Sequence, residues 1–146
     1  FAIDLSVSML KPVIFGKLAH PCGVALSPSE NALFVAETLK NRILRVVIHS
    51  SGVYHTSVFH QFSGRLGPTA IAVSPATGQL YVARYDFSEC SKNGVISILN
   101  SETGLCESEL SVQDASEITG LFFSRVQDDI LYATESSTNS LLKIQV

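Results

Sequence analysis

The feature of this sequence that most constrains its fold is a repeat. The clearest copy runs from Pro21 to Val46, and it returns between Pro68 and Arg84 and, more divergent, between Ile118 and Ile144. The same position holds a small residue in every copy: Gly23, Ala70 and Gly120. These positions are 47 and then 50 residues apart. A period of about 40–50 residues is typical of β-propeller blades, so we expect three blades.

Within each copy, apolar runs separated by turn residues predict the strands of a four-stranded antiparallel sheet. We place the first blade at about residues 20–62, the second at about 67–113, and the third at about 117–146 together with a strand at 13–18. The run Gly23–Ser27 is nearly all apolar, which predicts a strand covered on both faces. The predicted fold class is therefore all-β, with about three blades that make half of a six-bladed propeller.

The third blade stops before a fourth strand, whereas Val13–Leu18 is a spare predicted strand near the other end. A ring is commonly closed by a blade whose strands come from both termini. Three blades cannot close a ring alone, because propellers have roughly four to eight. Two solutions stay open: the chain is the C-terminal half of a longer protein, or two copies join head to tail. The start at Phe1, without Met, favours a fragment or a processed product.

Composition excludes several classes of function. The chain is 46% hydrophobic and 16% charged, with a formal net charge of −3, which is typical of a globular domain. No Lys/Arg stripe neutralises phosphates, so we expect no nucleic-acid partner. No apolar run reaches the roughly 18–20 residues of a membrane span. The three cysteines lack metal-site spacing, and they leave the cellular compartment undetermined.

Three segments carry a family resemblance: Gly23–Pro28 (Gly-Val-Ala-Leu-Ser-Pro), Leu33–Thr38 (Leu-Phe-Val-Ala-Glu-Thr) and Asn41–Arg45 (Asn-Arg-Ile-Leu-Arg). They resemble the strictosidine-synthase-like family, the related gluconolactonase/senescence-marker proteins and the NHL repeats. The likeness covers residues 20–146 as repeats and is specific across about residues 21–46. It implies a β-propeller whose ligands bind at the face where the innermost strand of each blade starts.

The resemblance also implies where a metal would bind. In the gluconolactonase branch the pattern is Asn-Gly-Val-Ala-x-Ser-Pro-Asp, and its Asn binds a divalent metal; here that position is Cys22. The next blade's pattern is Pro-Asp-Gly with a ligand Asp, and here Thr69 takes that place. A hard cation such as Ca²⁺ needs several oxygen ligands. We therefore expect no metal site and no other cofactor.

The strictosidine-synthase branch uses no metal and places a catalytic Glu at the start of a late blade's inner strand. Glu117 is the nearest match, and His20 is a candidate to assist it. A Glu acts as a general base when burial or a neighbour tunes its pKa toward neutrality. The alternative is that Glu117 is simply a solvated residue where a strand begins.

Aligning the three inner strands gives two columns at one end of the propeller. The first contains Cys22, Thr69 and Thr119, and the second contains His20, Gly67 and Glu117. A Cys near a His is a candidate nucleophile, because the thiolate is the reactive form and the imidazole can accept the thiol proton. The alternative makes Cys22 a small buried apolar residue and His20 an ordinary loop residue.

Other positions are predicted to bind or to support. Tyr85, Asp86 and Phe87 begin an insertion that runs to Lys92, and we expect it to contact a ligand or partner unless it is a mere length variation. Recurring residues predict a structural role in satisfying turn amides: Glu37, Asn41, Glu135 and Asn139. Arg84 replaces the Glu in the second blade, and we expect it to pair with a carboxylate.

Two function classes follow. The first is a propeller module that binds a partner or serves as a scaffold and lacks the family metal site. The alternative is a strictosidine-synthase-like enzyme of lyase or hydrolase type, with a Glu acid/base where the inner strands begin. The expected partners are a second copy of the chain or the missing half of the propeller, with a protein or small-molecule ligand on the same face.

Overall fold

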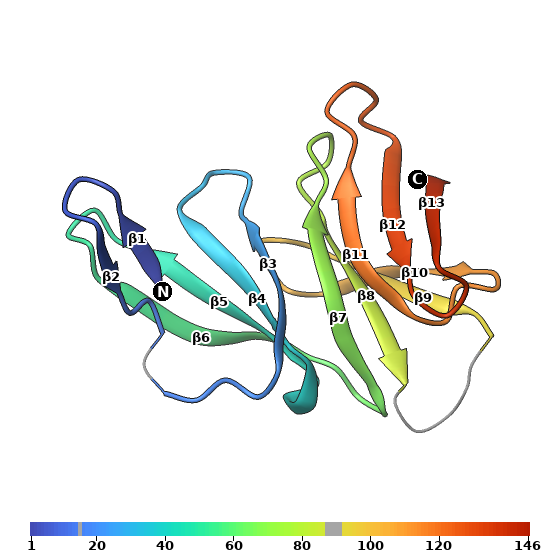
Figure 1. The fold of residues 1–146 in the computed structure, drawn as a ribbon, viewed down its shortest axis with the longest axis horizontal. Coiled ribbons are helices and arrows are strands. Elements are labelled where there is room, and N and C mark those ends of the chain that lie inside the picture. Colours follow the sequence, from blue (N-terminus) through green and yellow to red (C-terminus); the bar gives the residue numbers. More distant parts are fainter. Residues whose placement is uncertain (15, 87–91) are drawn as a thin grey trace.

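The computed structural model describes residues 1–14, 16–86 and 92–146. It contains three successive antiparallel sheets and a short N-terminal hairpin (Figure 1). The first sheet holds β3 (Pro21–Leu26), β4 (Ala32–Glu37), β5 (Arg42–Ile48) and β6 (Tyr54–Gln61). The second holds β7 (Leu66–Val73), β8 (Leu80–Asp86), β9 (Gly94–Leu99) and β10 (Cys106–Val112). The third holds β11 (Ile118–Phe123), β12 (Ile130–Glu135) and β13 (Ser140–Gln145), and the hairpin pairs β1 (Ala2–Asp4) with β2 (Met9–Lys11).

Each sheet is an up-and-down meander in sequence order, which is the topology of a propeller blade. The innermost strands β3, β7 and β11 lie side by side and all begin at the lower end in Figure 1. We call this end the channel mouth. A short helical turn, η1 (Thr38–Lys40), follows β4 at the same end. The prediction of an all-β fold built from propeller blades is thus confirmed.

Two apolar clusters hold the sheets together, and β8 contributes to both. Leu80 and Val82 face the first sheet and pack with Phe34. Tyr81 and Ala83 point the opposite way and pack against the third sheet. Side chains alternate between the two faces of a strand, so a strand between two sheets must be apolar at successive positions. This explains the continuous apolar run of β8.

The segment 13–18 differs from its prediction. Its described residues form no strand, and they do not extend the third sheet. Instead Val13, Ile14 and Leu18 pack against Val35 and a neighbouring apolar patch on the outer face of the first sheet. Among the described residues no further blade lies against that face, and covering it removes apolar surface from water.

The strand at Gly23–Ser27 is also less covered than predicted. β3 lies in the first sheet, and its Val24 and Leu26 are 64% and 46% exposed. The equivalent strand β7 is mostly buried, because sheets flank it on both sides. The apolar run therefore marks a strand built to be covered on both faces, but in this chain only one face of β3 has a sheet against it.

Among the described residues, no helix has the length and apolar character to cross a membrane.

Candidate functional site at the channel mouth

The three inner strands share one irregularity, a β-bulge at the channel mouth. The pairing register skips one residue between Pro21 and Gly23 in β3, and the same skip occurs in β7 and β11. The skipped residues are those of the first predicted column: Cys22, Thr69 and Thr119. A bulge leaves its extra residue out of the ladder and turns its side chain in a new direction. The scaffold therefore presents one side chain per blade at this end.

In the first blade, the bulge brings a thiol and an imidazole into contact. Cys22 Sγ lies 3.0 Å from His20 Nδ1, and both side chains are exposed. This excludes the alternative in which Cys22 is a buried apolar residue. His20 adopts a left-handed backbone conformation with φ of 57°, which is uncommon for residues other than Gly. The two predicted residues of this blade thus form one dyad.

The loop that carries His20 is pinned to the sheet by a buried carboxylate. Glu37 is fully buried at the end of β4, and its Oε1 accepts the N–H of Ala19 at 2.7 Å. The carbonyl of His20 accepts the N–H of Thr38 at 3.1 Å. Burial opposes ionisation of Glu37, but the hydrogen bonds from Ala19, Arg42 and Lys40 outweigh it and lower its pKa. The predicted role of Glu37 in satisfying turn amides is confirmed.

The third blade repeats the pin with other side chains. Glu135 is buried and accepts the N–H of Glu117 at 3.0 Å, and it also receives bonds from Ser137 and Thr138. Burial raises the pKa of Glu135, yet these hydrogen bonds dominate and hold it at about 2. The carbonyl of Glu117 accepts the N–H of Ser136, as that of His20 accepts the N–H of Thr38. Glu117 therefore lies at the position equivalent to His20, where β11 begins, as the alignment predicts.

The two hydroxyl residues of the column make different contacts. Thr69 Oγ1 donates to the carbonyl of Ile118 at 2.7 Å and so joins the second blade to the third. Thr119 is exposed, with its Oγ1 3.1 Å from Thr134 Oγ1. Thr69 is thus committed to an interblade bond, whereas Thr119 remains at the surface of the mouth.

In the second blade, Arg84 replaces the pinning carboxylate. It is buried, and its Nη1 lies 3.0 Å from Glu109 Oε1. Its guanidinium carbon also lies 4.3 Å from the centroid of the Phe62 ring. Burial lowers the pKa of Arg84, while the charge of Glu109 opposes that change. The predicted pairing of Arg84 with a carboxylate is confirmed, and its partners give it a structural role.

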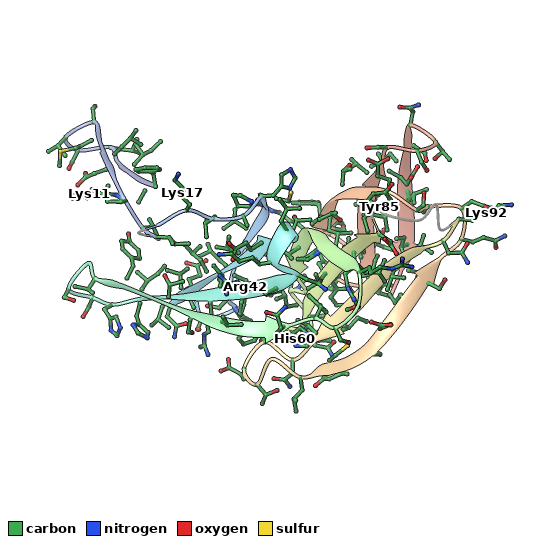
Figure 2. The ribbon with its side chains drawn as sticks, turned by 90° about the horizontal axis from the view of Figure 1, so that it is seen from below. Lys11, Lys17, Arg42, His60, Tyr85 and Lys92 are labelled. Carbon is green, nitrogen blue, oxygen red and sulfur yellow. The ribbon has the colours of Figure 1, made fainter. Side chains whose placement is uncertain are left out.

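The insertion is only partly described. Tyr85 and Asp86 are the last residues of β8, paired with Gly67 and Leu66, so they belong to a strand and not to the predicted loop. Figure 2, which views the molecule from the channel mouth, labels Tyr85. Phe87 lies outside the described residues.

Sequence reasoning missed an open hollow of about 480 Å³ along the inner strands. It runs past the middle of β3, β7 and β11 to the turn after β11, away from the bulges, and its lining includes Val24, Ile71, Val73, Phe122, Arg125 and Asp128. The apolar alternation of the inner strands indicates their packing faces but does not reveal this concave inner edge.

Comparison with known proteins identifies related propellers. No protein-family model matches the chain. It is 29% identical over 89 residues to "Lactonase drp35" of Staphylococcus epidermidis, covering 58% of this chain and 27% of that protein. It is 38% identical over 80 residues to "Lactonase drp35" of Staphylococcus saprophyticus, covering 52% of this chain and 24% of that protein. The match therefore spans only about a quarter of each relative.

Solved structures show the same fold. A gluconolactonase from Xanthomonas campestris superposes with a TM-score of 0.66 at 21% identity, covering 89% of this chain and 39% of that one. A regucalcin from Agrobacterium tumefaciens, described as calcium-binding, superposes with a TM-score of 0.66 at 19% identity, covering 80% and 38%. This chain is similar in sequence to drp35 lactonases, and it shares the β-propeller fold of the gluconolactonase and regucalcin structures. The predicted resemblance to the gluconolactonase-type branch of these propellers is confirmed.

The residues at the channel mouth do not fit the metal that this resemblance implies. The thiol of Cys22 contacts His20, and the hydroxyl of Thr69 is used in its bond to Ile118. Within residues 1–14, 16–86 and 92–146, no three His, Cys, Asp or Glu side chains gather in a way that could hold a metal ion. A hard divalent cation prefers several carboxylate and carbonyl oxygens. The bulge residues Cys22 and Thr69 supply neither the amide oxygen nor the carboxylate oxygen of the gluconolactonase-type pattern.

Proposed function

We propose that this chain forms part of a β-propeller hydrolase that opens lactones or related esters, with the reaction site at the channel mouth. The observation that carries the proposal is the set of three equivalent bulges, which places Cys22, Thr69 and Thr119 at one end of the inner strands. Such bulges are over-represented next to active sites, where they re-aim side chains. The substrate class comes from the similarity to drp35 lactonases.

Several residues have proposed roles within this site. Glu117 is a candidate acid/base, because its main chain is fixed by Glu135 where β11 begins. Thr119, exposed beside it, is a candidate to contact substrate, and Thr69 positions the second blade against the third. Tyr85 and Asp86, at the end of β8, are candidates to contact the remainder of the substrate or a partner.

A second candidate function is the partner-binding module without catalysis. What favours it is the loss of both oxygen ligands at Cys22 and Thr69, since a propeller can keep its fold after losing its chemistry. On this view the channel mouth and the end of β8 form a recognition surface.

The test is a turnover screen of the native protein on γ- and δ-lactones and aryl esters, with amine/aldehyde condensation as a separate arm. We expect hydrolysis of lactones, reduced in Glu117→Gln but not in Glu102→Gln, a matched change at an exposed residue of the turn between β9 and β10. Condensation without hydrolysis would instead support the strictosidine-synthase type. Absence of turnover in every arm would contradict the enzyme and support the binding module.

We further propose that the ring is completed by more blades, from the rest of a longer chain or from a second copy. Both end sheets expose apolar side chains on their outer faces: Val24 on the first, and Phe122 and Leu141, 55% and 70% exposed, on the third. Patches of this kind mark surfaces that bind other protein surfaces. Sedimentation of this 15.7 kDa chain is expected to show association, and a stable monomer would contradict the second-copy solution.

A further inference from the structure

We propose that Cys22 and His20 form a nucleophile–base dyad that performs acyl transfer without a metal. This inference rests on the proposed lactone hydrolysis and deepens it by assigning the nucleophile. It begins from the disagreement at the channel mouth: where the gluconolactonase-type pattern has a metal-binding Asn, this chain has a thiol in contact with an imidazole.

The contact requires a special backbone. On a regular strand, residues at i and i+2 point to the same face about 7 Å apart, too far for a hydrogen bond. Here the bulge at Cys22 and the positive φ of His20 shorten the separation of Sγ and Nδ1 to 3.0 Å. Uncommon backbone conformations of this kind persist only where surrounding structure holds them, and they cluster at active sites.

The surrounding structure does hold this one. The residue before His20 is bonded to the buried Glu37, and the carbonyl of His20 is bonded to Thr38. Thr38 in turn donates from Oγ1 to the carbonyl of Pro68 at 2.6 Å, which ties the loop to the second blade. Glu37 and Thr38 are therefore positioning residues that act through the main chain of residues 19 and 20.

The chemistry balances without a cofactor. His20 takes the proton of the Cys22 thiol, and the sulfur attacks the carbonyl carbon of the lactone. The ring C–O bond breaks, and the leaving alkoxide takes the proton from the imidazolium, which leaves a hydroxyacyl thioester on Cys22. His20 then takes a proton from water, the hydroxide attacks the thioester carbonyl, and the C–S bond breaks. The thiolate recovers the proton from His20, and the net reaction is lactone plus water to hydroxy acid.

The chain contains a matched control for the reactivity of this thiol. Cys106 is also exposed, and it lies at the start of β10 with its Sγ 3.6 Å from the carbonyl oxygen of Ser108. Desolvation and the charge of Glu109 raise the pKa of Cys106. A second exposed thiol on the same protein can thus be compared with Cys22 under identical conditions.

The experiment uses the native protein with two readouts. Peptide-resolved iodoacetamide labelling at pH 7 is expected to modify Cys22 at least tenfold faster than Cys106. The substitution His20→Gln is expected to lower the labelling rate of Cys22 at least fivefold and to leave the labelling rate of Cys106 unchanged. In lactone hydrolysis, Cys22→Ala is expected to lower kcat/KM at least 100-fold, whereas Cys106→Ser and chelation by EDTA leave it unchanged.

The two proposals fail in different ways. Lactone turnover that survives Cys22→Ala, or that EDTA abolishes, overturns the dyad and leaves the hydrolase standing. Absence of turnover in the unmodified protein overturns the proposed hydrolase activity. In that case the labelling experiment by itself tests whether His20 activates Cys22. If Cys22 and Cys106 are labelled at equal rates and His20→Gln changes neither rate, the dyad is overturned. Circular dichroism of each variant shows that a lost signal does not come from unfolding.

Discussion

The starts of β3 and β11 are built alike but equipped differently. Each has a bulge, and each has a buried carboxylate that pins the preceding main chain, Glu37 in the first blade and Glu135 in the third. In the first blade the bonded amide is that of Ala19, and the next residue, His20, places its imidazole against the Cys22 thiol. In the third blade the bonded amide is that of Glu117 itself. The repeat therefore determines where a side chain is presented, and the residue type at that place determines its chemistry.

The largest expected effect tests the pins themselves. Glu37→Ala and Glu135→Ala each leave partly buried donors without an acceptor, and we expect each to lower the free energy of unfolding by about 2 kcal/mol. Only Glu37→Ala should also slow iodoacetamide labelling of Cys22, because only Glu37 holds the loop of His20. Chemical denaturation and labelling measure the two effects. An equal decrease in the labelling rate of Cys22 in both variants would contradict the specific role of Glu37.

The next effect compares the two candidate bases. His20→Gln is expected to lower kcat/KM for lactone hydrolysis about 100-fold, equivalent to about 2.7 kcal/mol of transition-state stabilisation. Glu117→Gln, at the equivalent position of the third blade, is expected to lower it less than tenfold. Steady-state kinetics of both variants decide the order. The reverse order would move the acid/base role from the first blade to the third.

The third effect is a pH dependence of folding stability that arises from Glu135 in the third blade. The folded protein holds the pKa of Glu135 at about 2, below its ordinary value of 4.5. A lowered pKa contributes stability that is fully present above about pH 4.5 and is lost as the pH falls toward 2. Thermal unfolding of the native protein should therefore show a Tm that falls across this window. Glu135→Gln should flatten that fall; an unchanged slope would contradict the contribution of Glu135.

The smallest effect concerns the joints between blades. Thr38 Oγ1 donates to Pro68 O, and Thr69 Oγ1 donates to Ile118 O. Replacing either Thr by Val removes the donor and keeps the shape, so we expect a loss of about 1 kcal/mol in each case. Differential scanning calorimetry measures both. A much larger loss in one variant would show that the two joints are not equivalent.

Much of this architecture is predictable from the sequence because it repeats. The spacing of Gly23, Ala70 and Gly120 indicates the blades, and the recurrence of Glu37 and Glu135 indicates a structural pin. Repeated patterns report constraints that every blade shares, so they predict the scaffold and the columns at its end.

The dyad contact and the termini are not predictable in the same way. The residue type of His20 signals its left-handed conformation only weakly, because Gly adopts that conformation far more readily than His. The hydrogen bonds of Ala19 and His20 to Glu37 and Thr38 hold the backbone there. The segment 13–18 has the composition of a strand, but its apolar residues cover the open face of the first sheet. Burial of apolar surface overrides local strand propensity there.

We infer that the channel mouth hydrolyses lactones through the Cys22 thiol. The most direct test of this inference is the mass of the native protein after rapid mixing with a lactone and quenching in acid. Because ring opening loses no atoms, we expect an adduct equal to the whole mass of the lactone, located on the Cys22 peptide and absent in Cys22→Ser. Product formation with no adduct on Cys22, or an adduct that persists in Cys22→Ser, would contradict it.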